Sequence, residues 1–151
     1  MDIESWGRFP STVSNLNRLR WQSDNWIRDT DIPVLPRGNG RSYGDVCLNH
    51  NGTLVETLGL DRFIQFDAQS GILCCESGVL LSDILEFAVP LGWFLSVTPG
   101  TQYVTVGGAI ANDVHGKNHH RVGTFGNFLH RFELMRSDGS HLICSAEENT
   151  D

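Results

Sequence analysis

Long apolar runs and a signal-like start are missing from this sequence of 151 residues. No stretch approaches the roughly 18 apolar residues that a membrane-spanning helix needs. The first ten residues, MDIESWGRFP, lack the basic and then apolar layout of a secretory signal. The sequence therefore predicts a chain without a transmembrane segment. The cytoplasm is its expected location, and peripheral association with a membrane stays open.

Paired cysteine motifs are missing as well. The four cysteines, Cys47, Cys74, Cys75 and Cys144, form no CxxC pair and have no even spacing. A disulfide framework or a zinc site would show such a pattern. Neighbouring side chains on a strand point to opposite faces, which is the arrangement expected for Cys74 and Cys75. The pattern favours free thiols in a reducing compartment.

Basic residues are scarce. Eleven Lys and Arg against 18 Asp and Glu give a formal net charge of −7. Nucleic-acid-binding proteins usually offer a basic face to phosphates, so this balance argues against a nucleic acid as the main partner. Small molecules or proteins are the expected partners, and the sequence does not specify an oligomeric state. With 40% hydrophobic residues, the chain can bury one core of moderate size.

Helical patterns occur in three places. Spaced Leu16, Leu19, Trp26 and Ile27 permit a helix over residues 13–28. Small residues at 105–112 suit a tightly packed helical turn that faces a ligand. A further helix would have Ser82 as its N-cap and would stop at Pro90 and Gly92. Its buried face would consist of Ile84, Leu85, Ala88 and Leu91.

Strand patterns alternate with these helices. The pair Asp138 and Gly139 is a strong hairpin signal between two of the strands. The expected strands are 32–36, 53–57, the hairpin of 63–67 with 72–77, and the hairpin of 129–136 with 141–145. The sequence thus predicts an α+β fold.

A first glycine-rich loop covers residues 37–45, RGNGRSYGD. Glycines let a backbone turn successive N–H groups toward one anion, which suits a phosphate or pyrophosphate. Ser42 can add a hydroxyl donor, and Arg37 or Arg41 can add positive charge. The dinucleotide-binding fingerprint fails because its third glycine is due where Tyr43 stands. An ordinary surface loop is the alternative.

A second loop runs through residues 99–120. Small residues at 107–111 leave room for a flat ring or a phosphate to lie against the backbone. A P-loop that ended at Gly116 and Lys117 would need glycine at 111 and serine or threonine at 118, where Ala111 and Asn118 stand. A metal site is disfavoured because Gly116 interrupts any helix that would align His115 with His119.

His115 and Lys117 are the candidate reactive pair. An imidazole can donate or accept a proton, and an ammonium can hold an anionic or hydroxyl group. The alternatives are a buried histidine satisfied by backbone hydrogen bonds and a solvated lysine. For each of the two residues, the sequence alone leaves the functional and the structural interpretation open.

The order of these motifs resembles one family. RGNGRSYGD (37–45) is followed by PGT (99–101), VTVGGAIA (104–111) and HGKNHH (115–120). This arrangement resembles the FAD-linked oxidases of the vanillyl-alcohol oxidase superfamily, and within them it is most similar to the decaprenylphosphoryl-β-D-ribose 2-oxidase branch. The similarity runs from about Trp6 to the end of the chain.

The resemblance implies a PCMH-type FAD-binding domain of two α/β subdomains, with FAD extended between the lobes. The first lobe would cover about residues 1–97, and the second would begin in 98–151. The pyrophosphate would be held by Gly38, Asn39, Gly40, Arg41, Ser42 and Tyr43. The rest of the cofactor would be lined by Gly100, Thr101, Gly107, Gly108, Ala111, His115 and Gly116.

The implied reaction is removal of hydride from a carbinol carbon of a sugar or polyol, which can be lipid-linked, to the flavin. Lys117 matches a lysine that contacts substrate in the family, and His115 would be the second catalytic residue. Several relatives tether the flavin through a histidine where this chain has Arg41, so we expect FAD to be non-covalent.

Relatives continue past the motif at 147–151 into more of the FAD domain and a substrate domain. We therefore expect this chain to be an N-terminal portion of such an enzyme. The stretch between Pro10 and Ile32 is short for the family, so the first lobe is expected to be trimmed. A flavin-binding module without activity and a remnant that binds no cofactor are the other two hypotheses.

Overall fold

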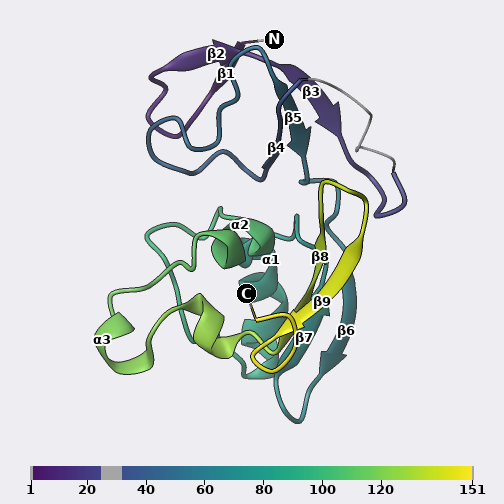
Figure 1. Cartoon of the computed structure of the whole chain (residues 1–151). Coiled ribbons are helices and arrows are strands. Elements are labelled where there is room, and N and C mark those ends of the chain that lie inside the picture. Colours follow the sequence, from purple (N-terminus) through teal and green to yellow (C-terminus); the bar gives the residue numbers. More distant parts are fainter. Residues whose placement is uncertain (1, 25–31, 151) are drawn as a thin grey trace.

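The computed structural model describes residues 2–24 and 32–150. Figure 1 shows two groups of elements, with strands β1–β5 in one and the helices and remaining strands in the other. Because both groups mix strands with irregular or helical segments, the α+β prediction is confirmed. The division of the chain near residue 97 stays a prediction.

The first group is built around one buried strand. Strand β5 (Thr53–Glu56) pairs in parallel with β3 (Asn15–Arg18) on one side and with β4 (Val34–Arg37) on the other. Leu54 and Val55 of β5 are both buried, as expected of a central strand covered on both faces. Strands β1 (Asp2–Glu4) and β2 (Ser11–Val13) form an antiparallel hairpin beside this sheet.

The second group packs short helices against two hairpins. The helices are α1 (Leu81–Ala88), α2 (Val106–Ala111) and α3 (His119–Val122), with 3-10 turns at Val89–Leu91 and Phe125–Phe128. Strand β6 (Phe63–Asp67) pairs with β7 (Ile72–Cys75), and β8 (Arg131–Met135) pairs with β9 (His141–Ser145). The core consists of Val79, Leu81, Ile84 and Ala88.

The six predicted strands and the small-residue helix are confirmed within a few residues. The helix predicted over residues 13–28 is wrong: residues 15–18 form strand β3, and residues 25–28 lie outside the described residues. The pairing of β3 with β5, more than 35 residues later, outweighs a weak local helix preference.

The boundaries of α1 also differ from the prediction. Leu80, not Ser82, is the N-cap, and the Asp83 carboxylate accepts the Leu80 N–H at 3.2 Å. Leu91 is 52% exposed and therefore does not belong to the buried face. Gly92 ends the helical segment with φ of 86°, as its position predicted.

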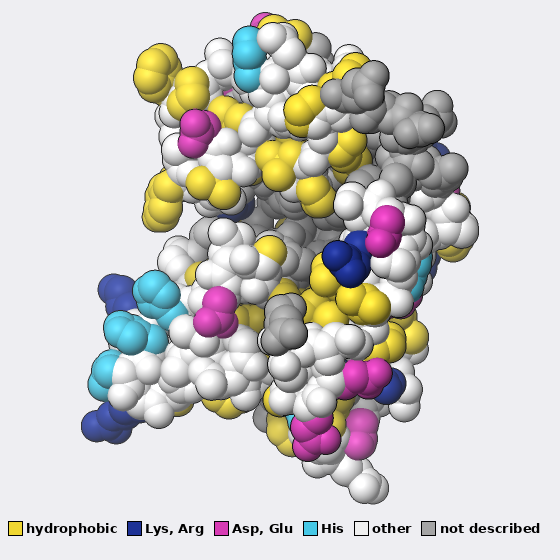
Figure 2. Space-filling model, in the orientation of Figure 1, with side chains coloured by type: hydrophobic (Ala, Val, Ile, Leu, Met, Phe, Trp, Pro, Cys, Tyr) yellow, Lys and Arg dark blue, Asp and Glu magenta, His cyan; other side chains and the backbone are white. Residues whose placement is uncertain are grey.

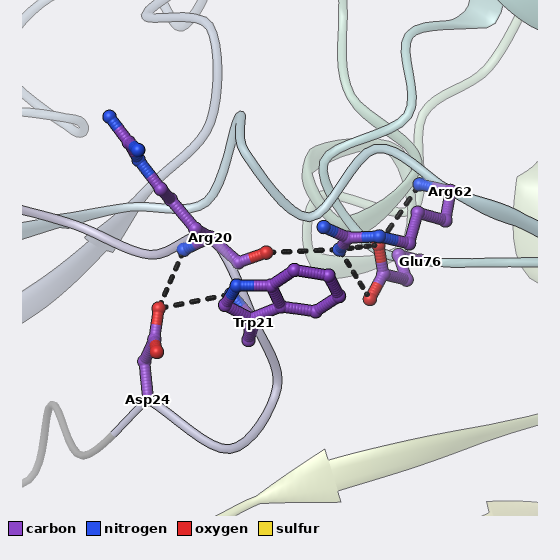
Figure 3. A network of polar contacts seen from close by, with 5 residues as sticks. All are labelled: Arg20, Trp21, Asp24, Arg62 and Glu76. Atoms are coloured by element: carbon purple, nitrogen blue, oxygen red, sulfur yellow. Dashed lines mark hydrogen bonds and ion pairs between the residues drawn. The ribbon is translucent and has the colours of Figure 1, made fainter.

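A polar network links the segment after β3 to the β6–β7 hairpin (Figure 3). The Arg62 guanidinium donates to the Glu76 carboxylate at 3.0 Å and to the Arg20 carbonyl at 2.9 Å. It also lies 3.8 Å from the centre of the Trp21 ring. Glu76 is 7% exposed, so this arginine compensates a carboxylate that has little contact with water. The network thereby fixes the two groups against each other.

The described residues include no helix long and apolar enough to cross a membrane.

Candidate functional site

The first glycine-rich loop begins where strand β4 ends. The Arg37 side chain folds back, so that its Nη2 donates to the Glu4 carbonyl at 2.9 Å and its Nη1 lies 3.9 Å from the Glu56 carboxylate. Gly40 has φ of 61°, and a Cβ there would collide with the Arg37 guanidinium. The left-handed backbone conformation therefore favours glycine at position 40, and a larger residue would also have to displace the Arg37 guanidinium.

The two glycine-rich loops meet directly. The Asn39 amide donates to the Tyr103 carbonyl at 2.8 Å, although 64 residues separate the two. A Cβ on Gly38 would collide with the hydroxyl of Thr105. Thr105 is 2% exposed and caps α2 by accepting the Gly108 N–H at 3.1 Å. The predicted pyrophosphate loop therefore lies against the start of α2.

The glycines of the second loop serve different purposes. A Cβ on Gly107 would lie 3.0 Å from Ser77 Cβ, and one on Gly116 would lie 2.8 Å from the Thr98 carbonyl. Both positions are small because the chain's own packing requires it. A Cβ on Gly100, by contrast, would meet no atom within 4 Å, and its φ is not left-handed. The fold therefore does not explain why residue 100 is glycine.

The remaining predicted cofactor residues lie on these loops with varying exposure. Tyr43 is 82% exposed. Ala111 ends α2 and is exposed, while Ser42 and Thr101 are half-buried. Their roles toward a cofactor stay predictions.

His115 and Lys117 lie on the segment that leads into α3. His115 is exposed, so the alternative of a buried histidine is wrong. Its ring centre lies 5.1 Å from that of His119, and its backbone bridges to Thr124. Lys117 is exposed and is the single lysine of the chain. Among the described residues, no hydrogen bond or ion pair joins His115 or Lys117 to the first loop.

Asp113 braces this segment. Its carboxylate accepts the Gly126 N–H at 2.9 Å. That hydrogen bond, with a smaller contribution from Thr124, lowers the pKa of Asp113 below its usual value. The brace connects the end of α2 to the turn at 125–128, so that the His115 segment is held at both ends.

Histidine and basic side chains gather around α3 (Figure 2). From residue 114 to residue 132 the chain contains no Asp or Glu, whereas it has 18 elsewhere. The same view shows the surface hollowed between the part that carries β1–β5 and the part that carries the helices.

A second hollow lies beneath the turn that joins β1 to β2, and the sequence did not indicate it. Its volume is about 520 Å³. We call it the hairpin hollow. The residues that line it are Glu4, Ser5, Trp6, Arg8, Arg37, Gly40 and Arg41. The spacing of Ser5, Trp6 and Arg8 in the sequence matches no ligand-binding motif.

Three buried polar atoms around this hollow have no hydrogen-bond partner within the part of the chain that the structure describes: Ser5 Oγ, Arg37 Nε and Arg41 Nε. A buried polar group left unpaired costs about 1–3 kcal/mol, so native chains rarely leave several in one place. Arg41 also lies 5.4 Å from the centre of the Trp6 ring and donates to the Asn39 carbonyl at 3.0 Å. The first loop thus holds hydrogen-bond donors that residues 2–24 and 32–150 leave unpaired.

Comparisons with known proteins agree with this geometry. A family model described as an FAD binding domain matches residues 24–145. Decaprenylphosphoryl-β-D-ribose oxidase of Mycolicibacterium smegmatis is 42% identical over 106 residues, which are 70% of this chain and 23% of the relative. L-gulonolactone oxidase of Mus musculus is 30% identical over 126 residues, which are 82% of this chain and 28% of the relative.

The fold comparison gives the same result. The crystal structure of 6-hydroxy-D-nicotine oxidase from Arthrobacter nicotinovorans aligns with a TM-score of 0.69 at 19% identity, over 78% of this chain and 26% of that one. The chain spans about a quarter of the length of these relatives. The family match covers most of the chain and the fold agrees with it. The chain therefore belongs to the FAD binding domain family of flavin-dependent oxidoreductases, with an α+β fold of the PCMH type.

Proposed function

We propose that this chain supplies the FAD-binding part of an enzyme that oxidises an alcohol carbon of a sugar or polyol. The observation that carries the proposal is the contact between the two glycine-rich loops, because Asn39 and Tyr103 join there beside unused arginine donors. The names of two relatives, which include a ribose derivative and L-gulonolactone, support the substrate class.

The residues present fit FAD. Arg37 and Arg41 each have a buried Nε without a partner, and such donors suit the negative charges of a diphosphate. Gly100 leaves open space that no part of the described chain fills. Gly38, Asn39, Gly40, Arg41, Ser42 and Tyr43 would hold the diphosphate, and Gly100, Thr101, Gly108 and Ala111 would line the remainder. When bound, FAD supplies a two-electron acceptor for the hydride of a carbinol carbon.

His115 and Lys117 would act on the substrate. The Lys117 ammonium would hold a hydroxyl or anionic group of the alcohol, since no acidic residue from 114 to 132 competes for it. The exposed His115 imidazole would take the hydroxyl proton as hydride leaves the carbon. The Asp113 brace would keep this segment in position.

A visible spectrum tests cofactor binding. The purified chain with added FAD should show bound flavin absorbance after gel filtration, and candidate polyols should bleach it without oxygen. Bound flavin that no polyol bleaches would favour a binding module without activity. Absence of bound flavin would contradict the proposal.

We also propose that FAD is held non-covalently, because Arg41 stands where several relatives have a tethering histidine. Acid precipitation of the loaded protein should release yellow cofactor into the supernatant. Colour retained in the pellet would show a covalent link.

Lys117 offers a specific test of the substrate side. Lys117→Ala should keep FAD affinity unchanged and slow the bleaching by polyols. Arg136→Ala removes an exposed positive charge from the β8–β9 turn and serves as the control. If polyols bleach the flavin of Lys117→Ala as fast as that of the unmodified chain, Lys117 is a solvated charge without a role toward the substrate.

A further inference from the structure

The hairpin hollow joins two segments that lie far apart in the sequence. Ser5, Trp6 and Arg8 belong to the turn between β1 and β2, whereas Arg37, Gly40 and Arg41 belong to the first glycine-rich loop. Its volume of about 520 Å³ lies within the range of small-molecule pockets, about 300–1,000 Å³. The hollow is therefore large enough for a phosphorylated group.

The lining of the hollow is positively charged in an acidic chain. Three arginines line it against one carboxylate, that of Glu4. Arg37 is partly compensated by Glu56 at 3.9 Å. Within the described part of the chain, Arg8 and Arg41 form no ion pair. An anion that entered the hollow would meet two guanidiniums whose charge is not neutralised.

Contacts with the chain hold the Arg37 and Arg41 guanidiniums in place and leave some of their N–H donors unpaired among the described residues. The Arg37 Nη2 bond to the Glu4 carbonyl ties the two walls together, and Arg41 lies over Trp6. Ser5 is 5% exposed, and its hydroxyl joins Arg37 Nε and Arg41 Nε as a donor without a partner. Guanidiniums and a hydroxyl that line one hollow suit the oxygens of a phosphate.

We propose that the hairpin hollow binds a phosphate group, with Ser5 and Arg8 of the hairpin opposite Arg37 and Arg41 of the loop. The phosphate belongs either to the diphosphate of FAD or to a separate phosphate-bearing ligand. The first source rests on the proposed function and adds the β1–β2 hairpin to the cofactor site. The second source does not depend on it.

The test measures binding of three ligands by calorimetry: FAD, riboflavin, which has no phosphate, and inorganic phosphate. The variants are Ser5→Ala, which removes one buried oxygen, Arg8→Ala, and Arg8→Lys, which keeps the charge. Arg136→Ala is the control with the same change in net charge. Thermal unfolding of each variant establishes that it folds.

If the hollow holds the diphosphate, Ser5→Ala and Arg8→Ala weaken FAD binding roughly tenfold, a change of about 1.4 kcal/mol. Riboflavin binding stays unchanged, Arg8→Lys is intermediate, and inorganic phosphate competes with FAD. If the phosphate belongs to another ligand, inorganic phosphate binds without displacing FAD, and the same two variants lose that phosphate binding.

The proposal is overturned if folded Ser5→Ala and Arg8→Ala bind both FAD and phosphate as the unmodified chain does, or if the unmodified chain binds neither. A chain that binds phosphate through Arg8 but takes up no FAD would instead contradict the proposed function alone.

Discussion

Replacing Gly38 by alanine should disturb the contact between the two loops more than any other single methyl group in the site. The added Cβ would collide with the Thr105 hydroxyl and lie 3.1 Å from its Cγ2. Thr105 cannot rotate away without giving up the Gly108 N–H that it accepts at 3.1 Å. Overpacking of this kind costs about 1–3 kcal/mol. We expect Gly38→Ala to lower the free energy of unfolding by that amount and to weaken FAD binding.

A double-mutant cycle separates this clash from a general effect of alanine. Thr105→Ala alone should cost about 1 kcal/mol, because α2 loses its N-cap. With the hydroxyl removed, Gly38→Ala should cost little more, so the two changes should fall short of additivity by most of the cost of Gly38→Ala alone, about 1–3 kcal/mol. Urea unfolding followed by tryptophan fluorescence measures all three variants, with Gly100→Ala as a control for an added methyl that meets nothing. Additive effects would refute the proposed contact.

Three further outcomes are expected. Gly100→Val should change the stability of the chain by less than about 0.5 kcal/mol but weaken FAD binding on the order of tenfold; unchanged binding in a titration would place the cofactor elsewhere. Arg62→Ala should lower the free energy of unfolding in urea by about 1–3 kcal/mol, since Glu76 is 7% exposed and loses the guanidinium while it keeps the backbone N–H of residue 62; a loss below about 0.5 kcal/mol would show that this N–H and water compensate the carboxylate. Burial raises the pKa of Cys75 to about 11, so at pH 8 Cys75 stays a thiol, and iodoacetamide should modify the exposed Cys74 first. Mass spectrometry can compare the variants Cys74→Ser and Cys75→Ser, and equal rates of modification at the remaining cysteine would contradict this.

The parts of the fold that were predictable are those set by local chemistry. Asp138 and Gly139 predicted the last hairpin, and Gly139 takes φ of 81° there. The segment at 15–18 was not predictable in this way. Its spaced leucines fit a helix, but the strand forms because β5 lies beside it, and that partner is more than 35 residues away. Local periodicity does not encode such a pairing.

The same distinction between local patterns and long-range contacts applies to the candidate site. Both glycine-rich loops were predicted from composition and motif order, but the contact between Asn39 and Tyr103 spans 64 residues. Composition alone does not predict such a contact. The hairpin hollow was missed because Ser5 and Arg8 form no motif with the loop that they face. The folded structure indicates it through three buried atoms that have no partner among the described residues: the Ser5 hydroxyl oxygen and the Nε atoms of Arg37 and Arg41.

The charge distribution connects the two ends of the proposed reaction. The chain carries a net charge of −7, yet the hairpin hollow and the segment from 114 to 132 each concentrate positive charge. The residues that line the hollow belong to the group of β1–β5. The segment includes α3, which lies in the other group. Salt screens exposed charges separated by more than about 8–10 Å at physiological ionic strength. Added salt should therefore weaken cofactor binding and substrate binding, and Arg8 variants should reduce the salt dependence of the first, whereas Lys117 variants should reduce that of the second.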